Sequence, residues 1–328
     1  PVAALFALAL ALRVGLALLT EFKPLFPDYF YNDAAMYDAA ARTMLVAWAD
    51  GSERTFLSPG TETYAIWTAA LYKVVGPNPL APKLANALFG ACAALAWGFA
   101  AAMLFGRRAG SWALLLAAAW PSHVFYTSQN FKEAPTLLLL AVALASWLAA
   151  LRAATPARRH AAGAAGALAS AMTGLFRSHL VPFCALAGAA GAAALLARRG
   201  RPALGPAAAL LLWSLSGPIL YKGAYLLMQP HLHGPRHGGA PLLRPVSSLA
   251  DPEREVNPDS PRGISEYRQA RLHYSRDGSR LQFNREIETA FFPEARFETW
   301  PDVLAFLPKA SFYELFMPLP ALYPMAGK

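Results

Sequence analysis

The sequence predicts an all-α protein that crosses a membrane several times, with about seven transmembrane helices and a polar segment after the last of them. Of its 328 residues, 56% are hydrophobic and only 15% are charged, and the mean hydropathy is +0.31. Few soluble chains of this length have such a composition. The apolar residues also gather in runs of roughly 18 to 22, long enough to cross a hydrocarbon layer of about 30 Å as helices.

The expected transmembrane domain covers residues 1–221. Its first apolar run is not a signal peptide, because Arg13 lies within it and no small-residue cleavage pattern follows. The Ala- and Gly-rich region after His160 suits closely packed helices, although it could also form one broken segment. The predicted spans are residues 2–20, 82–104, 110–127, 134–152, 161–176, 179–197 and 203–221.

The arginines predict the orientation of these spans. The basic turns at residues 107–108, 152–159 and 198–201 lie on one side of the membrane only if residues 176–179 form the tip of a hairpin. By the positive-inside rule that side is cytoplasmic. The arginines cluster at helix ends, and this explains the net charge of +9 without a nucleic-acid partner. We therefore expect a multi-pass protein of a bacterial inner membrane, with its functional face on the periplasmic side.

The first outer loop, residues 21–81, is expected to contain two helices at the membrane interface. Residues 33–49 have helical propensity, with Met36 and Met44 on one apolar face, and residues 64–75 form a second apolar, aromatic stretch. Both are too short to span the bilayer.

The C-terminal third is expected to be polar and outside the membrane. Residues 222–302 predict a small outer subdomain or a loop. Pro308, Pro318 and Pro320 interrupt the apolar stretch 303–323, so residues 303–328 are expected to form an interfacial or re-entrant segment rather than a regular helix. Because both ends of the sequence look cut, we expect a further span beyond residue 328.

Cysteine and histidine patterns predict neither a disulfide framework nor a metal site. Cys92 and Cys184 lie inside predicted spans, where a thiol behaves as a small apolar group. His231, His233 and His237 stand among glycines and prolines without further ligands. Whether a divalent cation takes part in the function is left open.

Charged residues inside or beside the first two spans mark the bundle interior and its outer edge. Arg13, in the middle of a span, needs an internal partner or a water-filled cavity. Asp33 lies just outside the first span, at the start of a predicted helix, where it could act as a general base or as a helix N-cap. Tyr37 follows one turn later and could line the same site or belong to the aromatic belt.

Several short motifs occur in a characteristic order over residues 5–180. A first span with a central arginine is followed by Asp-x-x-x-Tyr, by Val75-Gly76, and by Lys83-Leu84-x-Asn86-x-Leu88-x-Gly90. Pro121, the turn 128–133 and Phe176-Arg177 continue the series. This order resembles the GT-C class of membrane glycosyltransferases, and more narrowly the branch of protein O-mannosyltransferases, lipid A aminoarabinose transferases and rhizobial lipopolysaccharide glycosyltransferases.

The resemblance implies transfer of a sugar from a polyprenyl-phosphate donor to a lipid, glycan or protein acceptor, with Asp33 in the position of the catalytic acidic residue of the first loop. The family often has a second acidic residue beside it. Here Ala34 follows, which leaves such a role to Asp38 or Glu133. Lys83 is expected to snorkel or to contribute to substrate binding.

Three residues of later outer turns are candidates for the same site. Lys132 could meet a lipid-linked phosphate while Glu133 orients the acceptor or Lys132, although a glutamate is also favoured at a helix start. Arg177 could bind phosphate oxygens through its guanidinium fork or simply snorkel at the interface.

The expected reaction is an inverting attack by a deprotonated acceptor, with the proton passing to Asp33. A transporter would instead place ionisable or broken spans near the membrane midplane. A polysaccharide polymerase or ligase would use similar lipid-linked donors, and a non-catalytic scaffold is a further alternative.

Overall fold

The computed structural model describes residues 2–23, 25, 31–51, 59–178, 180–200, 203–232, 260–262 and 295–316. The chain divides into two compact units, one formed by Pro1–Leu25 with Asp33–Pro235 and the other by Phe26–Asn32 with Arg236–Lys328. Every regular element in these described ranges is a helix. The prediction of an all-α protein is therefore confirmed for this part of the chain.

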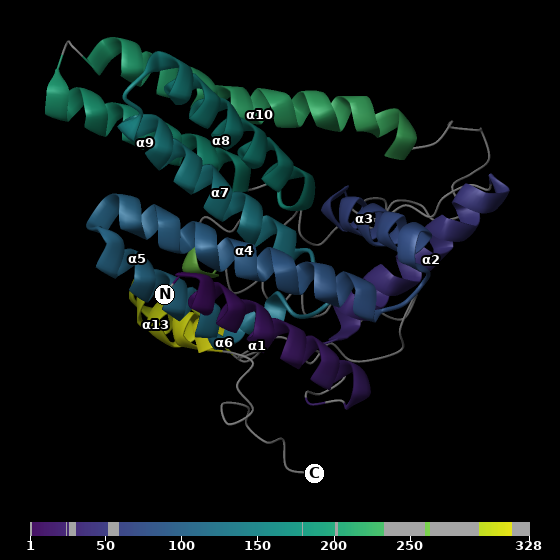
Figure 1. The fold of residues 1–328 in the computed structure, drawn as a ribbon. Coiled ribbons are helices and arrows are strands. Elements are labelled where there is room, and N and C mark those ends of the chain that lie inside the picture. Colours follow the sequence, from purple (N-terminus) through teal and green to yellow (C-terminus); the bar gives the residue numbers. More distant parts are fainter. Residues whose placement is uncertain are drawn as a thin grey trace. The chain divides into compact units, whose positions relative to one another are not determined.

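In the first unit, α4 packs against α1, α5 and α7, and the pairs α7–α8, α8–α10 and α9–α10 extend the bundle (Figure 1). The helices of this unit are α1 (Val2–Phe22), α2 (Asn32–Asp50), α3 (Pro59–Val75), α4 (Leu80–Phe105), α5 (Arg107–Ala119), α6 (Pro121–Tyr126), α7 (Glu133–Arg152), α8 (Pro156–Phe176), α9 (Leu180–Arg199) and α10 (Leu204–Leu232).

Five helices among the described residues are long and apolar enough to cross a membrane: Val2–Phe22, Leu80–Phe105, Glu133–Arg152, Leu180–Arg198 and Leu204–Ala224. Five of the predicted spans fall on these helices. The composition of an integral membrane protein is thus matched by helices of membrane-spanning length, and many of their large apolar side chains lie exposed on the surface of the protein.

The other two predicted spans, 110–127 and 161–176, are not among these five helices. The first is interrupted, because Pro121 lacks an N–H and forces Trp120 into an extended conformation, with φ −63° and ψ 121°. Two short helices, α5 and α6, result. The second lies within α8, a continuous helix of 21 residues that begins among arginines and is rich in small residues, so its hydropathy is lower.

Helices α7 to α10 share one apolar core, centred on Trp147 of α7. The buried members of this core are Trp147, Ala150, Ala167, Ala192, Ala207 and Leu210. A Cβ on Gly166 would lie only 2.8 Å from the Trp147 ring, so glycine is needed where α8 passes this ring. Small residues therefore allow close helix packing here, as the Ala- and Gly-rich sequence suggested.

Both helices expected in the first outer loop are present. Helix α2 matches residues 33–49 closely, whereas α3 begins at Pro59 and so extends further toward the N-terminus than residues 64–75. Their shared core contains Met44 of α2 and Tyr72 of α3, together with small alanines.

The second unit contains α13 (Trp300–Phe316). Asp302 in its first turn caps the start of the helix, because its carboxylate accepts hydrogen bonds from the Thr299 backbone N–H (2.8 Å) and the Thr299 hydroxyl (2.9 Å). The helix continues through Pro308, so the expectation that residues 303–316 do not form a regular helix is wrong. An interfacial or re-entrant placement of this segment stays a prediction. Residues 222–232 of the expected polar segment belong to α10. Residues 233–259, 263–294 and 317–328 lie outside the described residues.

Candidate functional site

Arg13 of α1 is completely buried and forms hydrogen bonds to residues on both sides of the break between α5 and α6. Its Nε donates to the Thr127 hydroxyl (2.8 Å), and its terminal nitrogens donate to the carbonyls of Ala118 (3.1 Å) and Ala117 (3.0 Å). Because Pro121 cannot donate to the Ala117 carbonyl, the arginine replaces a helical donor. Arg13 thus has the internal partners that a mid-span charge requires.

Helix α4 approaches this arginine closely at Gly90. A Cβ at that position would lie 2.3 Å from the Thr127 hydroxyl oxygen and 2.6 Å from the Arg13 Nε atom. Any larger residue would displace the hydrogen-bonded pair. The glycine therefore lets α4, α1 and the end of α6 meet at one point.

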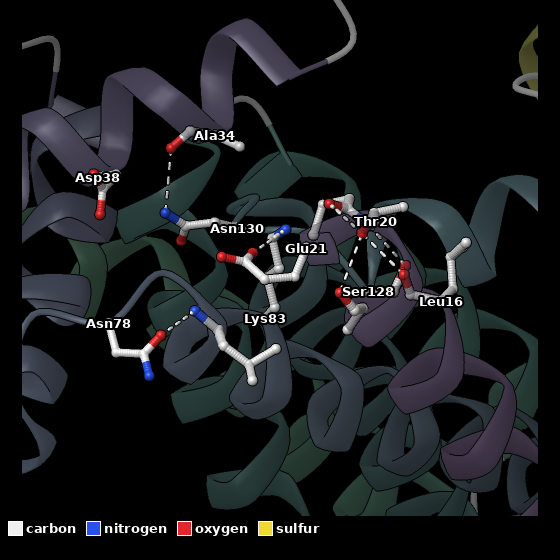
Figure 2. Close-up of polar contacts among 12 residues, drawn as sticks. Leu16, Thr20, Glu21, Ala34, Asp38, Asn78, Lys83, Ser128 and Asn130 are labelled. Atoms are coloured by element: carbon white, nitrogen blue, oxygen red, sulfur yellow. Dashed lines mark hydrogen bonds and ion pairs between the residues drawn. The ribbon is translucent and has the colours of Figure 1, made fainter. Parts of the chain in front are cut away.

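The loop that follows α6 is buried although it is polar. Gln129 is fully buried, and its amide donates to the Thr20 hydroxyl of α1 (2.9 Å). The Asn86 amide of α4 donates to the backbone carbonyls of Gln129 (2.6 Å) and Phe131 (2.9 Å). Figure 2 shows Thr20 and Ser128 on facing segments of this network. Two spans thus fix the loop directly ahead of Lys132.

The same loop also binds the start of α2. The Asn130 amide donates to the Ala34 carbonyl (3.3 Å), a contact visible in Figure 2. The Asn130 side-chain oxygen accepts from the Tyr64 hydroxyl of α3 (2.9 Å). Ala34 directly follows Asp33, so these bonds join the first outer loop to the segment that carries Lys132 and Glu133.

Four charged residues from three separate turns come together at this place. Asp33 lies in the first turn of α2, Lys132 and Glu133 lie at the start of α7, and Arg177 directly follows α8. The Arg177 guanidinium forms an ion pair with the Glu133 carboxylate. Asp33 interacts electrostatically with the other three residues. The structure thus brings these four charges within electrostatic reach of one another.

The electrostatic surroundings favour neutral forms of two of these groups. Burial raises the pKa of Asp33, the Glu133 carboxylate raises it further, and Lys132 and Arg177 act in the opposite direction. Burial also lowers the pKa of Lys132, and the neighbouring Arg177 adds to this effect. The raised pKa makes the Asp33 carboxylate a stronger base than an ordinary aspartate.

The four charges differ in their bonding. Glu133 and Arg177 neutralise each other, whereas the side chains of Asp33 and Lys132 have no hydrogen-bond or salt-bridge partner within the described ranges. A carboxylate without a partner can accept a proton, and an ammonium beside it can bind an anion. The site thus combines a candidate base with a candidate anion-binding cation.

Tyr37 borders this group of charges but is buried, with 1% of its surface exposed. Its hydroxyl is hydrogen-bonded to Thr61. Burial raises its pKa, and the Glu133 and Asp33 carboxylates add to the increase. The structure therefore places Tyr37 at the side of the site, as a packed residue.

Two other predicted site residues, Asp38 and Lys83, form hydrogen bonds and ion pairs away from the four charges. The Asp38 carboxylate accepts from Arg42 (2.9 Å) and from the Tyr72 hydroxyl, which fastens α2 to α3. Lys83 forms a 2.8 Å ion pair with Glu21 and joins α4 to the end of α1 (Figure 2). The structure brings neither side chain into contact with the four charges, and substrate binding by either residue stays a prediction.

Sequence reasoning missed the buried polar residues that support the site, namely Tyr64, Asn86, Gln129 and Asn130. Asn86 and Tyr64 are fully buried, and Asn130 is only 3% exposed. An asparagine inside an apolar span was a usable signal, because buried amides need partners. Within the described ranges, no group of three or more His, Cys, Asp or Glu side chains could hold a metal ion.

No protein-family model matches the sequence, and no curated protein or solved structure shows significant similarity to it. The resemblance to GT-C glycosyltransferases therefore depends on the order of short motifs alone. The geometry of Asp33, Lys132, Glu133 and Arg177 is the feature of the structure that indicates a function.

Proposed function

We propose that this protein is a membrane glycosyltransferase of the GT-C type, which moves a sugar from a polyprenyl-phosphate donor to a lipid, glycan or protein acceptor. One observation carries the proposal. Asp33 and Lys132, both without bonding partners in the described part of the chain, lie beside the Glu133–Arg177 ion pair, where three outer turns meet. Such a group of charges suits a reaction that releases a phosphate and a proton.

In the proposed reaction, an acceptor hydroxyl or amine attacks the anomeric carbon as the bond from that carbon to the phosphate oxygen breaks. The proton of the acceptor passes to the Asp33 carboxylate, and polyprenyl phosphate leaves with the bonding electron pair. Lys132 binds the departing phosphate, and Arg177 adds its guanidinium N–H groups that Glu133 does not use. Because attack comes from the opposite side of the sugar, the configuration at the anomeric carbon inverts.

We also propose seven membrane crossings, with the site on the periplasmic side. Arg177, directly after α8, contacts Glu133 at the first residue of α7. Helix α8 therefore returns along the whole of α7, and α5 with α6 returns along α4 in a similar way, since Phe131 reaches Asn86 near the start of α4. The arginine-rich turns then all lie at the opposite, cytoplasmic end.

The structure offers less support for a transporter. Its most deeply placed charge, Arg13, is saturated by hydrogen bonds to backbone and to Thr127. A transport site would leave such a group available to its substrate. A polysaccharide polymerase or ligase remains the closest alternative, because it too would bind a lipid-linked phosphate through arginine.

The test is sugar transfer by the full-length protein in lipid nanodiscs, with radiolabelled polyprenyl-phosphate sugars as donors. We expect Asp33→Asn to lower kcat by at least about 100-fold, within the range for loss of a general base. Asp50→Asn, at the other end of α2, is the matched control and should keep wild-type kcat.

Wild-type transfer by a folded Asp33→Asn variant would refute the general-base role. If the wild type used only lipid diphosphate-linked oligosaccharides, the polymerase or ligase alternative would replace the proposal.

A further inference from the structure

Tyr64 of α3 lies completely buried between the three segments that carry the four charges. Its ring meets the ring of Tyr37 edge-on, with centroids 4.7 Å apart, and the ring of Phe176 with centroids 6.4 Å apart. Its hydroxyl donates to the Asn130 side-chain oxygen (2.9 Å) and accepts from the Asn86 amide (2.7 Å). A single side chain therefore touches α2, the loop before α7, and the end of α8.

Each contact of Tyr64 lies close in sequence to one of the charges. Tyr37 is one helical turn after Asp33, Asn130 is two residues before Lys132, and Phe176 directly precedes Arg177. Asn130 also binds the carbonyl of Ala34, the residue next to Asp33. The ring and the hydroxyl of Tyr64 therefore contact residues close to the charges in all three charged segments.

The separations among the charges matter because Coulomb energies and proton transfers depend steeply on distance. Long side chains such as Lys132 and Arg177 have many rotatable bonds. Packing therefore fixes the backbone positions from which they extend rather than their charged ends. A buried hydrogen-bonded aromatic is rigid, because any movement would leave its hydroxyl or its hydrogen-bond partners unpaired inside the protein. A rigid side chain of this kind can keep the backbones of the three charged segments at fixed separations.

We propose that Tyr64 is a positioning residue that sets the separations among Asp33, Lys132–Glu133 and Arg177. Its ring packs between α2 and the end of α8, and its hydroxyl orients Asn130, which binds the start of α2 through the Ala34 carbonyl. Loss of the hydroxyl alone therefore loosens the start of α2 relative to the end of α8. The proposed effect of Tyr64 on the separations among the charges depends only on its observed contacts. Its effect on catalysis rests in addition on the proposed transferase function.

The test replaces the hydroxyl and keeps the ring. Tyr64→Phe is compared with Tyr72→Phe, a buried tyrosine of the same helix whose hydroxyl bonds Asp38 instead. Spin labels at Ala35 and Ser178, both exposed, report the distance between α2 and the end of α8 by pulsed electron paramagnetic resonance. Cys92 and Cys184 are replaced by alanine in this background so that only the two labels are present.

We expect Tyr64→Phe to broaden or shift this distance distribution, and Tyr72→Phe to leave it as in the parent. Asn130→Ala, which removes the hydroxyl's acceptor and the Ala34 bond together, should act like Tyr64→Phe and serves if that variant folds poorly. An unchanged distribution in both Tyr64→Phe and Asn130→Ala would overturn the proposal, whatever the activity.

Activity provides the second measurement. With a polyprenyl-phosphate sugar as donor, Tyr64→Phe should lower kcat by about 10- to 100-fold and change donor KM little, since misplacement affects the reacting geometry more than binding. Tyr72→Phe should keep kcat. A fall in kcat of equal size in both variants would show a merely structural role for Tyr64. If the wild type transfers no sugar, the proposed function fails, while the distance measurement still decides the positioning role.

Discussion

Replacement of Arg13 by methionine should destabilise the protein strongly, although Arg13 is far from the four charges in sequence. The methionine keeps the length and the helical propensity of the side chain but removes the guanidinium. Four hydrogen bonds between helices are lost, to the Thr127 hydroxyl, to the carbonyls of Ala117 and Ala118, and to the His123 ring. Side-chain hydrogen bonds inside membrane proteins contribute about 0.6–1.7 kcal/mol each. The expected loss is therefore about 2–7 kcal/mol.

The assay is reversible unfolding of the purified full-length protein in mixed micelles, with detergent as denaturant and circular dichroism as signal. Arg107→Met, at the exposed start of α5, is the control for loss of a positive charge and should change the unfolding free energy by less than about 0.5 kcal/mol. Arg13→Lys should recover only part of the loss, because an ammonium lacks the planar fork that reaches several acceptors at once.

A free energy of unfolding for Arg13→Met within about 0.5 kcal/mol of the wild type would refute this reasoning. It would mean that the carbonyls of Ala117 and Ala118 accept hydrogen bonds from other donors in the variant, with no loss of stability. The break at Trp120 and Pro121 would then not depend on the arginine.

Three further predictions concern packing, pH and the donor. Gly90→Ala should lower the unfolding free energy by about 1–3 kcal/mol because of steric overlap, whereas Gly15→Ala, which meets no atom within 4 Å, should not; equal effects in the same unfolding assay would contradict the packing. Because its pKa is raised, Asp33 loses its basic form at a higher pH than an ordinary aspartate as pH falls, and Glu133→Gln should move the acid limb of the kcat/KM profile to lower pH; an unmoved limb counts against the electrostatic coupling. Arg177→Ala should raise the Kd for the polyprenyl-phosphate donor, measured by calorimetry, by about 10-fold or more and leave the acceptor Kd unchanged; the reverse order would exclude a phosphate-binding role.

The helices themselves were accessible from sequence because their signals are local. Runs of apolar residues and helical propensity identify α1, α4, α7, α9 and α10 without knowledge of their neighbours. The break at Pro121 was misjudged for a different reason. Hydropathy averages over a window, whereas one proline removes a single N–H and turns a span into two short helices.

The candidate site was predicted only as a set of outer turns. Asp33, Lys132, Glu133 and Arg177 are charged residues at helix ends, which sequence and charge parity identify. The assignment of Asp38 and Lys83 to the same set could not be checked in that way. Lys83 pairs with Glu21 of another helix, and such pairing depends on which helix faces lie together. Asp38 pairs with Arg42 four residues later in α2, a spacing that the sequence itself shows.

The sequence by itself determined that this chain forms apolar helices of membrane-spanning length and which turns between them carry charge, because composition, periodicity and arginine placement act over one helix at a time. Only the tertiary structure decided which charges have partners. It paired Glu133 with Arg177, left Asp33 and Lys132 without partners among the described residues, and placed Tyr64 between their segments. These outcomes depend on separations of a few ångströms between residues far apart in the chain, and such separations follow from the packing of whole helices.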